Sequence, residues 1–176
     1  MKTFYDYYKK NLIYLDAEPN KAHKALAYLE KQGKLKAVIT QNIDGLHQLA
    51  GSDTVYELHG SVLRNYCVKC GKFHDASFVK NHPDVPRCDC GGIVKPDVVL
   101  YEESLNADTI EGAVHAISHA DLLIVAGTSL TVYPAAGLIN YYQGNRLVLI
   151  NKTETKRDDI ANLVLHEKLG DVFARL

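Results

Sequence analysis

The chain has 176 residues, of which 47% are hydrophobic and 23% are charged, and its formal net charge at pH 7 is −1. This composition is typical of a globular domain with its own core, and the near-neutral charge argues against a general nucleic-acid-binding protein. No apolar run reaches the roughly 18 residues of a membrane span, and the N-terminus has no signal-peptide core. We therefore expect a cytoplasmic protein with no membrane partner and no specific nucleic-acid partner.

Helical and strand patterns alternate along the chain. Residues 3–15 are predicted to form a helix with Phe4, Tyr8, Leu12 and Leu15 on its buried stripe. The further predicted elements, in chain order, are a helix from Pro19–Asn20 to Gly33, a strand at 36–40, a helical turn at 42–50, strands at 54–58 and 97–101, a helix at 106–119, a buried strand at 122–126, a helix at 134–144, strands at 146–151 and 162–166, and a final helical turn. Strands that alternate with helices and are apolar on both faces predict an α/β fold with a mainly parallel sheet.

The four cysteines form two close pairs, Cys67–Cys70 and Cys88–Cys90, separated by 17 residues. In a reducing compartment, such clustering favours a metal site over disulfides. Two thiolate pairs on turns at this spacing are typical of a tetrahedral Zn²⁺ site. Gly71 follows the first pair and Gly91–Gly92 follow the second, and such glycines let the backbone turn tightly around a metal.

The second pair has the spacing C-x-C, where C-x-x-C is usual. His74 and His82 lie between the pairs and are alternative ligands, and free core cysteines are the non-metal alternative. Residues 64–95 show little hydrophobic periodicity and are interpreted as a small inserted module. No open coordination position or nearby base is evident, so the predicted metal is structural.

Polar side chains follow the predicted strand at 36–40. Gln41, Asn42, Asp44 and His47 come where a hydrophobic strand ends. In open α/β sheets, ligands bind at the carboxyl ends of the strands. Two carboxamides and a carboxylate supply both donors and acceptors for a polar ligand.

His59 follows the next predicted strand, in the sequence Glu-Leu-His-Gly. Taken alone, it is interpreted equally well as a capped loop residue. However, an imidazole is suited to proton transfer near pH 7, and His59 comes only 12 residues after His47. It is therefore a candidate general base.

Two later strands also end in polar residues. Gly127, Thr128 and Ser129 follow the strand at 122–126, and their backbone N–H groups and hydroxyls suit a phosphate or a ribose. The signal is weak alone, because many strand–helix turns have this composition. Asn151 is at the end of the strand predicted at 146–151 and either binds a ribose hydroxyl or shapes a turn.

These motifs, in this order, resemble those of bacterial-type sirtuins, which are NAD-dependent protein deacylases. The matching stretches are TQNIDGLH, ELHGS, the cysteine pairs, KPDVVLYEE, AGTSLTVYPAAGL and INKT. The resemblance implies a Rossmann-like NAD-binding domain at residues 1–63 and 96–176, and a zinc-ribbon module at 64–95. It also implies an acyl-lysine protein or peptide as the substrate, with nicotinamide and O-acyl-ADP-ribose as products.

The resemblance assigns a role to each candidate residue. It makes His59 the general base, which helps to deprotonate a ribose hydroxyl after the acyl oxygen has attacked the ribose carbon and nicotinamide has left. The implied NAD-binding residues are Gln41, Asn42, Asp44, Gly127, Thr128, Ser129, Asn151, Lys152, Thr153 and Leu169. The implied peptide-binding residues are Val98, Val99, Leu100 and Tyr101, and the implied Zn²⁺ ligands are Cys67, Cys70, Cys88 and Cys90. His47 is expected to be mainly structural.

The sequence also departs from the sirtuin pattern. The first strand of the Rossmann-like sheet and its glycine-rich turn are not found before Thr40, so we expect an N-terminally truncated sirtuin with weak NAD binding and impaired deacylation. Glu102 stands where many sirtuins have glycine, close to the implied peptide cleft. A sirtuin-like ADP-ribosyltransferase and a non-catalytic, zinc-stabilised interaction module are the alternative functions.

Overall fold

The computed structural model describes residues 1–175, which belong to two compact units. Unit 1 consists of Met1–Glu18, Asn42–Leu46 and His59–Leu105. Unit 2 consists of Pro19–Gln41, His47–Leu58 and the chain from Asn106 onward. Among the described residues, no helix is long and apolar enough to cross a lipid bilayer. The predicted domains, residues 64–95 and the rest of the chain, have other boundaries than these two units, and they stay a prediction.

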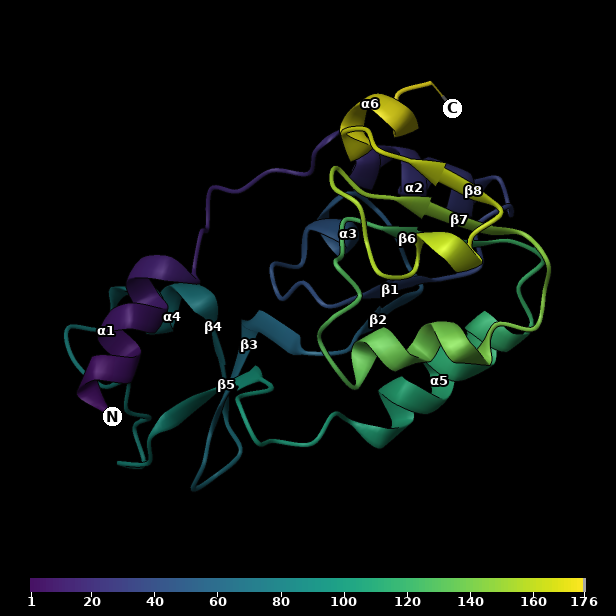
Figure 1. The fold of residues 1–176 in the computed structure, drawn as a ribbon. Coiled ribbons are helices and arrows are strands. Elements are labelled where there is room, and N and C mark those ends of the chain that lie inside the picture. Colours follow the sequence, from purple (N-terminus) through teal and green to yellow (C-terminus); the bar gives the residue numbers. More distant parts are fainter. Residues whose placement is uncertain (176) are drawn as a thin grey trace. The chain divides into compact units, whose positions relative to one another are not determined.

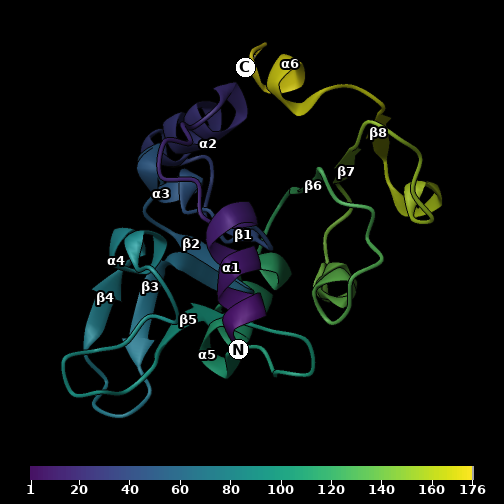
Figure 2. The same cartoon turned by 90° about the vertical axis from the view of Figure 1, so that its left-hand side faces the viewer.

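Unit 1 contains a three-stranded antiparallel sheet in the order β4-β3-β5 (Figure 1). The strands are β3 (Gly60–Cys67), β4 (Phe73–Asp75) and β5 (Val94–Val98). The short helix α4 (Ala76–Asn81) follows β4 directly and lies beside β4 and β3 (Figure 2). Strand β3 therefore runs from the residue after His59 to Cys67, and β5 runs back in the opposite direction after the second cysteine pair.

Helix α1 (Lys2–Asn11) completes the core of unit 1. Tyr5 and Tyr8 are buried, and the Tyr5 hydroxyl donates a 2.8 Å hydrogen bond to the carbonyl of Val94. The hydrophobic cluster that includes these tyrosines also contains Cys67, Val79 and Cys88, so α1 packs into the same core as the cysteines.

The expected buried stripe of α1 was wrong at its C-terminal end. The helix ends at Asn11, and Leu12 and Leu15 are 37% and 47% exposed. Beyond the end of a helix, residues no longer follow a 3.6-residue period, so the predicted stripe cannot continue. Ile13 is fully buried in their place.

Unit 2 contains two parallel sheets, as the alternation of strands and helices predicted. Strands β1 (Val38–Thr40) and β2 (Val55–Glu57) form one sheet. Strands β6 (Leu123–Ala126), β7 (Leu147–Ile150) and β8 (Leu163–Leu165) form the other, in the order β6-β7-β8 (Figure 1). In each parallel sheet, all carboxyl ends lie at the same edge.

The helices of unit 2 begin at side chains that satisfy their first N–H groups. Asn20 caps α2 (Lys21–Lys31) and Asn106 caps α5 (Ala107–Ser118). The shorter helices are α3 (Leu46–Leu49), the 3₁₀ helices η1 (Ala135–Tyr141) and η2 (Asp158–Ile160), and α6 (Leu169–Phe173). The first residue of α3, Leu46, is assigned to unit 1, and the other residues of that helix are assigned to unit 2. Helix α2 contacts α6, and a buried cluster of Ala22, Ile150 and Phe173 joins both helices to β7.

Two strand predictions need correction. The strand predicted at 122–126 was expected to be buried, yet Leu123, Ile124 and Val125 are half-buried and Ala126 is exposed, because β6 is an edge strand within the described chain. The strand predicted at 97–101 ends at Val98. It ends there because the N–H of Leu100 binds the carboxylate of Glu103, at 3.0 Å, in place of a neighbouring strand.

Candidate active site

The four cysteine thiols form one cluster in unit 1. Their Sγ atoms all lie within 4.8 Å of one another, and the closest pairs are 3.4 to 3.7 Å apart. A tetrahedral Zn²⁺ with Zn–S bonds of about 2.3 Å places its sulfurs about 3.8 Å apart. The residues present therefore fit Zn²⁺, and the C-x-C pair closes the set without a histidine.

The thiols already influence one another's protonation. Burial raises the pKa of Cys67, but N–H groups of Cys70 and Lys69 and the neighbouring thiols donate to its sulfur and bring the pKa down to about 6. The N–H of Lys72 acts to lower the pKa of Cys70, but hydrogen bonds with the thiols of Cys90 and Cys67 outweigh it and raise that pKa to about 12. A cation held by Cys67, Cys70, Cys88 and Cys90 would remove this competition by stabilising all four thiolates.

Backbone turns hold the cysteine pairs in place. The N–H of Gly71 donates to the carbonyl of Cys67 at 2.9 Å, and the N–H of Gly91 donates to the carbonyl of Cys88 at 2.8 Å. Both glycines have positive φ angles, 72° and 80°, a conformation that favours glycine. This confirms the expectation that glycines turn the chain around the cluster.

His59 lies at the start of β3, against the end of β5. Its carbonyl accepts a 3.0 Å hydrogen bond from the N–H of Val99, and Gly60 pairs with Val98. At Gly60 a Cβ atom would be 2.0 Å from the carbonyl oxygen of Asp97, so only glycine allows the two chains to approach this closely. The candidate base is thereby held next to the first two predicted peptide-binding residues, Val98 and Val99.

The polar loop after β1 packs against β3, the strand that follows His59. The N–H of Val62 donates to the carbonyl of Ile43 at 2.9 Å, which places Asn42 and Asp44 beside the segment that follows His59. Asn42 is exposed and Asp44 is half-buried. One oxygen of Asp44 accepts the N–H of Leu46 at 3.0 Å, so this carboxylate also shapes the start of α3.

The structure therefore brings together three of the predicted segments within unit 1: His59, the loop containing Asn42 and Asp44, and Val98–Val99. Leu100 and Tyr101 follow in a turn, and Tyr101 is fully exposed. These segments come from three separate parts of the sequence, and backbone hydrogen bonds hold them at one end of the β3–β5 pair.

In unit 2, the predicted NAD-binding residues gather at the carboxyl edge of the β6-β7-β8 sheet. Ala126 pairs with Ile150, so Gly127 and Asn151, the next residues along each strand, are neighbours. The N–H of Gly127 donates to the carbonyl of Ile150 at 2.9 Å. A Cβ atom at Gly127 would be 2.8 Å from Leu169, which shows that Leu169 lies against the same turn.

The hydroxyls after β6 are engaged in local turns. The Thr128 hydroxyl accepts the N–H of Leu130 at 3.2 Å, and the Ser129 hydroxyl is 2.7 Å from that of Thr131. Hydroxyls of this kind retain further donor or acceptor capacity for a ligand.

The side chain of Asn151 stabilises the turn that follows β7. The Asn151 amide donates to the carbonyl of Thr153 at 2.8 Å, so it shapes the turn, one of its two anticipated roles. Lys152 and Thr153 are exposed on that turn.

Gln41 follows β1 and is half-buried, at the carboxyl edge of the β1–β2 sheet. His47 packs its ring against that of His23, with centroids 4.6 Å apart, and its carbonyl accepts the N–H of Ser52 at 3.0 Å. These contacts fit the structural role expected for His47.

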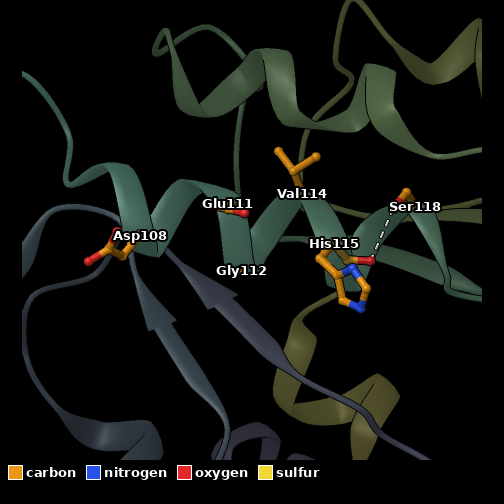
Figure 3. A pocket seen from close by; sticks show the side chains of 6 residues that line it. All are labelled: Asp108, Glu111, Gly112, Val114, His115 and Ser118. Carbon is orange, nitrogen blue, oxygen red and sulfur yellow. Dashed lines mark hydrogen bonds between the residues drawn. The ribbon is translucent and has the colours of Figure 1, made fainter.

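A shallow hollow of about 530 Å³ lies along α5 and contains none of the predicted site residues. It is lined by Asp108, Glu111, Gly112, Val114, His115 and Ser118, all on that one helix (Figure 3). The Ser118 hydroxyl donates to the carbonyl of His115 at 3.1 Å, which ties the end of the helix together. The hollow is therefore a feature of one helix surface, separate from the sheet edges that carry the polar residues.

Comparison with known proteins identifies the family of this chain. A model of the Sir2 family matches residues 1–134, about three quarters of the sequence. The chain belongs to the Sir2 family. It is 61% identical over 177 residues to a protein of Clostridium perfringens named NAD-dependent protein deacetylase, a match that spans 99% of this chain and 72% of that protein. A protein of Clostridium acetobutylicum with the same name is 60% identical over 174 residues, 98% of this chain and 71% of that protein.

Solved structures of Sir2 proteins share the fold. A structure of Sir2 bound to acetylated peptide is 42% identical, with a TM-score of 0.91 over 99% of this chain and 76% of that one. A complex of Sir2 with a p53 peptide and NAD⁺ is 43% identical, with a TM-score of 0.91 over 99% and 75% of the two chains. The α/β Sir2 fold expected from the sequence motifs is thus confirmed.

Sequence reasoning gave no role to Gly60, and it gave Gly92 only a role in the turn after the second cysteine pair. Gly60 permits the close backbone contact beside His59, and Gly92 is buried against the Cys67 sulfur. The Gly91–Gly92 pair was interpreted as turn-forming from the sequence, but the close approach of Gly92 to the Cys67 sulfur has no local sequence signal. Gly60 gave no separate signal, since its necessity depends on a strand 37 residues further along the chain.

Proposed function

We propose that this Sir2-family chain is an NAD-dependent protein-lysine deacylase that releases nicotinamide and O-acyl-ADP-ribose. The observation that carries the proposal is the grouping in unit 1 of His59, the loop with Asn42 and Asp44, and Val98–Val99. A proton acceptor, polar groups for a ribose and a strand edge for a peptide are what this reaction needs at one place. The names of the relatives support the same activity.

In the proposed reaction, His59 is the general base. Its imidazole accepts the proton of a ribose hydroxyl and makes that oxygen nucleophilic toward the acyl carbon. Asn42 and Asp44 hold the ribose and the nicotinamide amide through their donors and acceptors. Gln41 is a further proposed NAD-binding residue. NAD, a co-substrate, supplies the ADP-ribosyl group that accepts the acyl group.

The peptide is proposed to bind along Val98–Tyr101. Strand β5 is an edge strand in the described part of the β4-β3-β5 sheet, and an extended peptide adds to such an edge through main-chain hydrogen bonds. The acyl-lysine of a peptide bound there lies close to His59, because the carbonyl of His59 is bonded to Val99.

The adenosine and phosphate parts of NAD are proposed to bind at the carboxyl edge of the β6-β7-β8 sheet. Gly127, Thr128 and Ser129 supply a backbone turn and two hydroxyls there, beside Leu169. The remaining proposed contacts are Asn151, Lys152 and Thr153, on the adjacent turn.

The cysteine cluster is proposed to hold a structural Zn²⁺ through Cys67, Cys70, Cys88 and Cys90. Four thiolate ligands would leave no open coordination position, so the metal would stabilise the region of the β4-β3-β5 sheet and would take no part in the reaction. We propose that residues 64–95 are the zinc-ribbon module and that residues 1–63 and 96–176 form the NAD-binding domain. A cytoplasmic location fits four cysteines that are free rather than paired in disulfides.

The experiment that tests this function follows the fate of NAD labelled in its adenylate phosphate. With an acetyl-lysine peptide, deacylation transfers the label to free O-acetyl-ADP-ribose. Stable transfer of the label to protein, with the peptide still acetylated, would instead support an ADP-ribosyltransferase. Unchanged NAD and peptide after prolonged incubation would support the non-catalytic alternative.

A further inference from the structure

The turn after β5 holds a glutamate in a backbone conformation that favours glycine. Glu102 has φ 71°, in the left-handed region, where a side chain with a Cβ atom is disfavoured. Among the described non-glycine residues, only Glu102 and Leu130 have positive φ angles. Residues in such conformations are concentrated at binding and catalytic sites, so the conformation of Glu102 suggests a functional role.

The surrounding turn is well defined. The N–H of Glu103 donates to the carbonyl of Leu100 at 3.1 Å, which closes a four-residue turn with Glu102 in its third position. The carboxylate of Glu103 accepts the N–H of Leu100 at 3.0 Å and pairs with Lys95 at 2.7 Å. A turn with positive φ at its third residue normally has glycine there. The turn therefore presents Glu102 in a fixed place although glycine would form the turn with less strain.

The turn carries an aromatic residue and an acidic residue next to each other in the sequence. Tyr101 is fully exposed and Glu102 is exposed beside it. Because Glu103 is already paired with Lys95, Glu102 gives the turn its net negative charge. A carboxylate and an aromatic face together suit a cationic side chain, which binds one through an ion pair and the other through a cation–π contact.

We propose that Tyr101 and Glu102 form a subsite that selects acyl-lysine peptides with an arginine or lysine near the acyl-lysine. The proposal rests on the proposed function, in which the peptide lies along Val98–Tyr101. A peptide on that edge runs past the turn, and its flanking residues meet Tyr101 and Glu102. The strain at Glu102 is then the cost of placing a negative charge at the end of the peptide site.

The test measures the binding of three fluorescent acetyl-lysine peptides that differ only in one flanking residue: arginine, alanine or glutamate. In the presence of NAD, the wild-type chain should bind the arginine peptide about three- to tenfold more tightly than the alanine peptide, in the range of an exposed ion pair plus a cation–π contact. Raising the salt to about 0.5 M should reduce this preference, because salt screens exposed charges.

Variants locate the preference on the turn. Glu102→Gln should bring the arginine-to-alanine ratio close to one and leave the affinity for the alanine peptide unchanged, while Tyr101→Leu should reduce the ratio about twofold. Glu111→Gln, which removes an exposed carboxylate on α5, should keep the wild-type ratio. Glu102→Gly should raise the melting temperature by about 1–4 °C by relieving the left-handed strain.

The outcomes separate this proposal from the proposed function. If the acetylated alanine peptide binds better than its unacetylated form but the three peptides bind equally, the subsite is overturned and the function stands. If no acetylated peptide binds better than its unacetylated form, the proposed function fails and this proposal fails with it. A melting temperature of Glu102→Gly at or below that of the wild type would overturn the argument from strain.

Discussion

Gly92→Ala should disrupt the zinc site through a single added methyl group. Gly92 is buried, and a Cβ atom at this position would lie 2.5 Å from the Cys67 sulfur and 2.7 Å from the Cβ of Lys69. Ordinary contacts between heavy atoms are about 3.5–4.0 Å, so the sulfur must move by about 1 Å. Zn–S distances tolerate only about 0.2 Å, and hence we expect Cys67 to be lost as a ligand.

The assay is zinc competition with a chromophoric chelator, together with titration of reactive thiols in the native state. The wild type should hold one Zn²⁺ per chain with its thiols protected. Gly92→Ala should bind Zn²⁺ at least about 100-fold more weakly, at the upper end of what changes around a metal site cost. Because metal-binding energy in small modules is folding energy, its melting temperature should also fall.

Two other glycines supply matched controls. At Gly91 an added Cβ would meet nothing within 4 Å, but its φ of 80° makes alanine strained by about 1–2 kcal/mol, so Gly91→Ala should lower stability and keep one Zn²⁺. Gly170 has neither a close neighbour nor a positive φ and lies in α6, so Gly170→Ala should keep the wild-type zinc affinity and should not lower the melting temperature. Wild-type zinc affinity in Gly92→Ala would refute the geometry of the cluster.

The other predictions concern the reaction, the NAD turn and a helix contact. His59→Ala should reduce turnover about 100-fold or more with little change in melting temperature, and near-normal turnover would exclude His59 as the base. Gly127→Ala should weaken NAD binding about tenfold in calorimetry, because its φ is 64°, whereas Gly137→Ala, which has room for a Cβ, should not. Burial raises the pKa of Glu30, but hydrogen bonds from the N–H groups of Thr54 and Asp53 outweigh this effect and lower the pKa overall. Glu30→Gln should therefore reduce the free energy of unfolding by about 1 kcal/mol at pH 7. Since the folded pKa is depressed, this loss should shrink as the pH falls below about 4.5, and denaturant unfolding that shows the same loss at every pH would contradict it.

Sequence patterns predicted the site best where geometry follows from the chain direction. The carboxyl ends of parallel strands share an edge, so Gly127 and Asn151 had to be neighbours once both were assigned to the ends of adjacent strands. The cluster of cysteines was equally predictable, because two close pairs at this spacing are typical of thiols that share one metal ion. In both cases the local pattern carries the long-range information.

Prediction was weak at the ends of helices and strands, where hydrogen bonds that no hydrophobic pattern encodes decide the conformation. The end of β5 at Val98 depends on the Glu103 carboxylate, which binds the N–H of Leu100, and no hydrophobic pattern encodes that contact. The exposure of Leu12 follows from the end of α1 at Asn11, which has neither glycine nor proline to mark it. The segment at 134–144 has a helical composition, yet only Ala135–Tyr141 are helical, as a 3₁₀ helix.

The packing of α1 was also beyond a reading of local patterns. Tyr5 and Tyr8 are buried in the same cluster as Cys67 and Cys88, although these cysteines lie far from both tyrosines in the sequence. Periodicity indicates that a helix has an apolar face, but it does not indicate which partner covers that face. The structure shows that the cysteine-bearing region and α1 share one core.

The measurement that tests the account most directly is the stoichiometry of the products. The 176-residue chain, incubated with NAD and an acetyl-lysine peptide, is analysed by mass spectrometry for nicotinamide, deacetylated peptide and O-acetyl-ADP-ribose together. The account predicts one molecule of each for every lysine that is deacetylated, a ratio that does not depend on the rate. Deacetylation that releases free acetate without consuming NAD would contradict it, and so would nicotinamide release accompanied by ADP-ribosylated protein and an unchanged peptide.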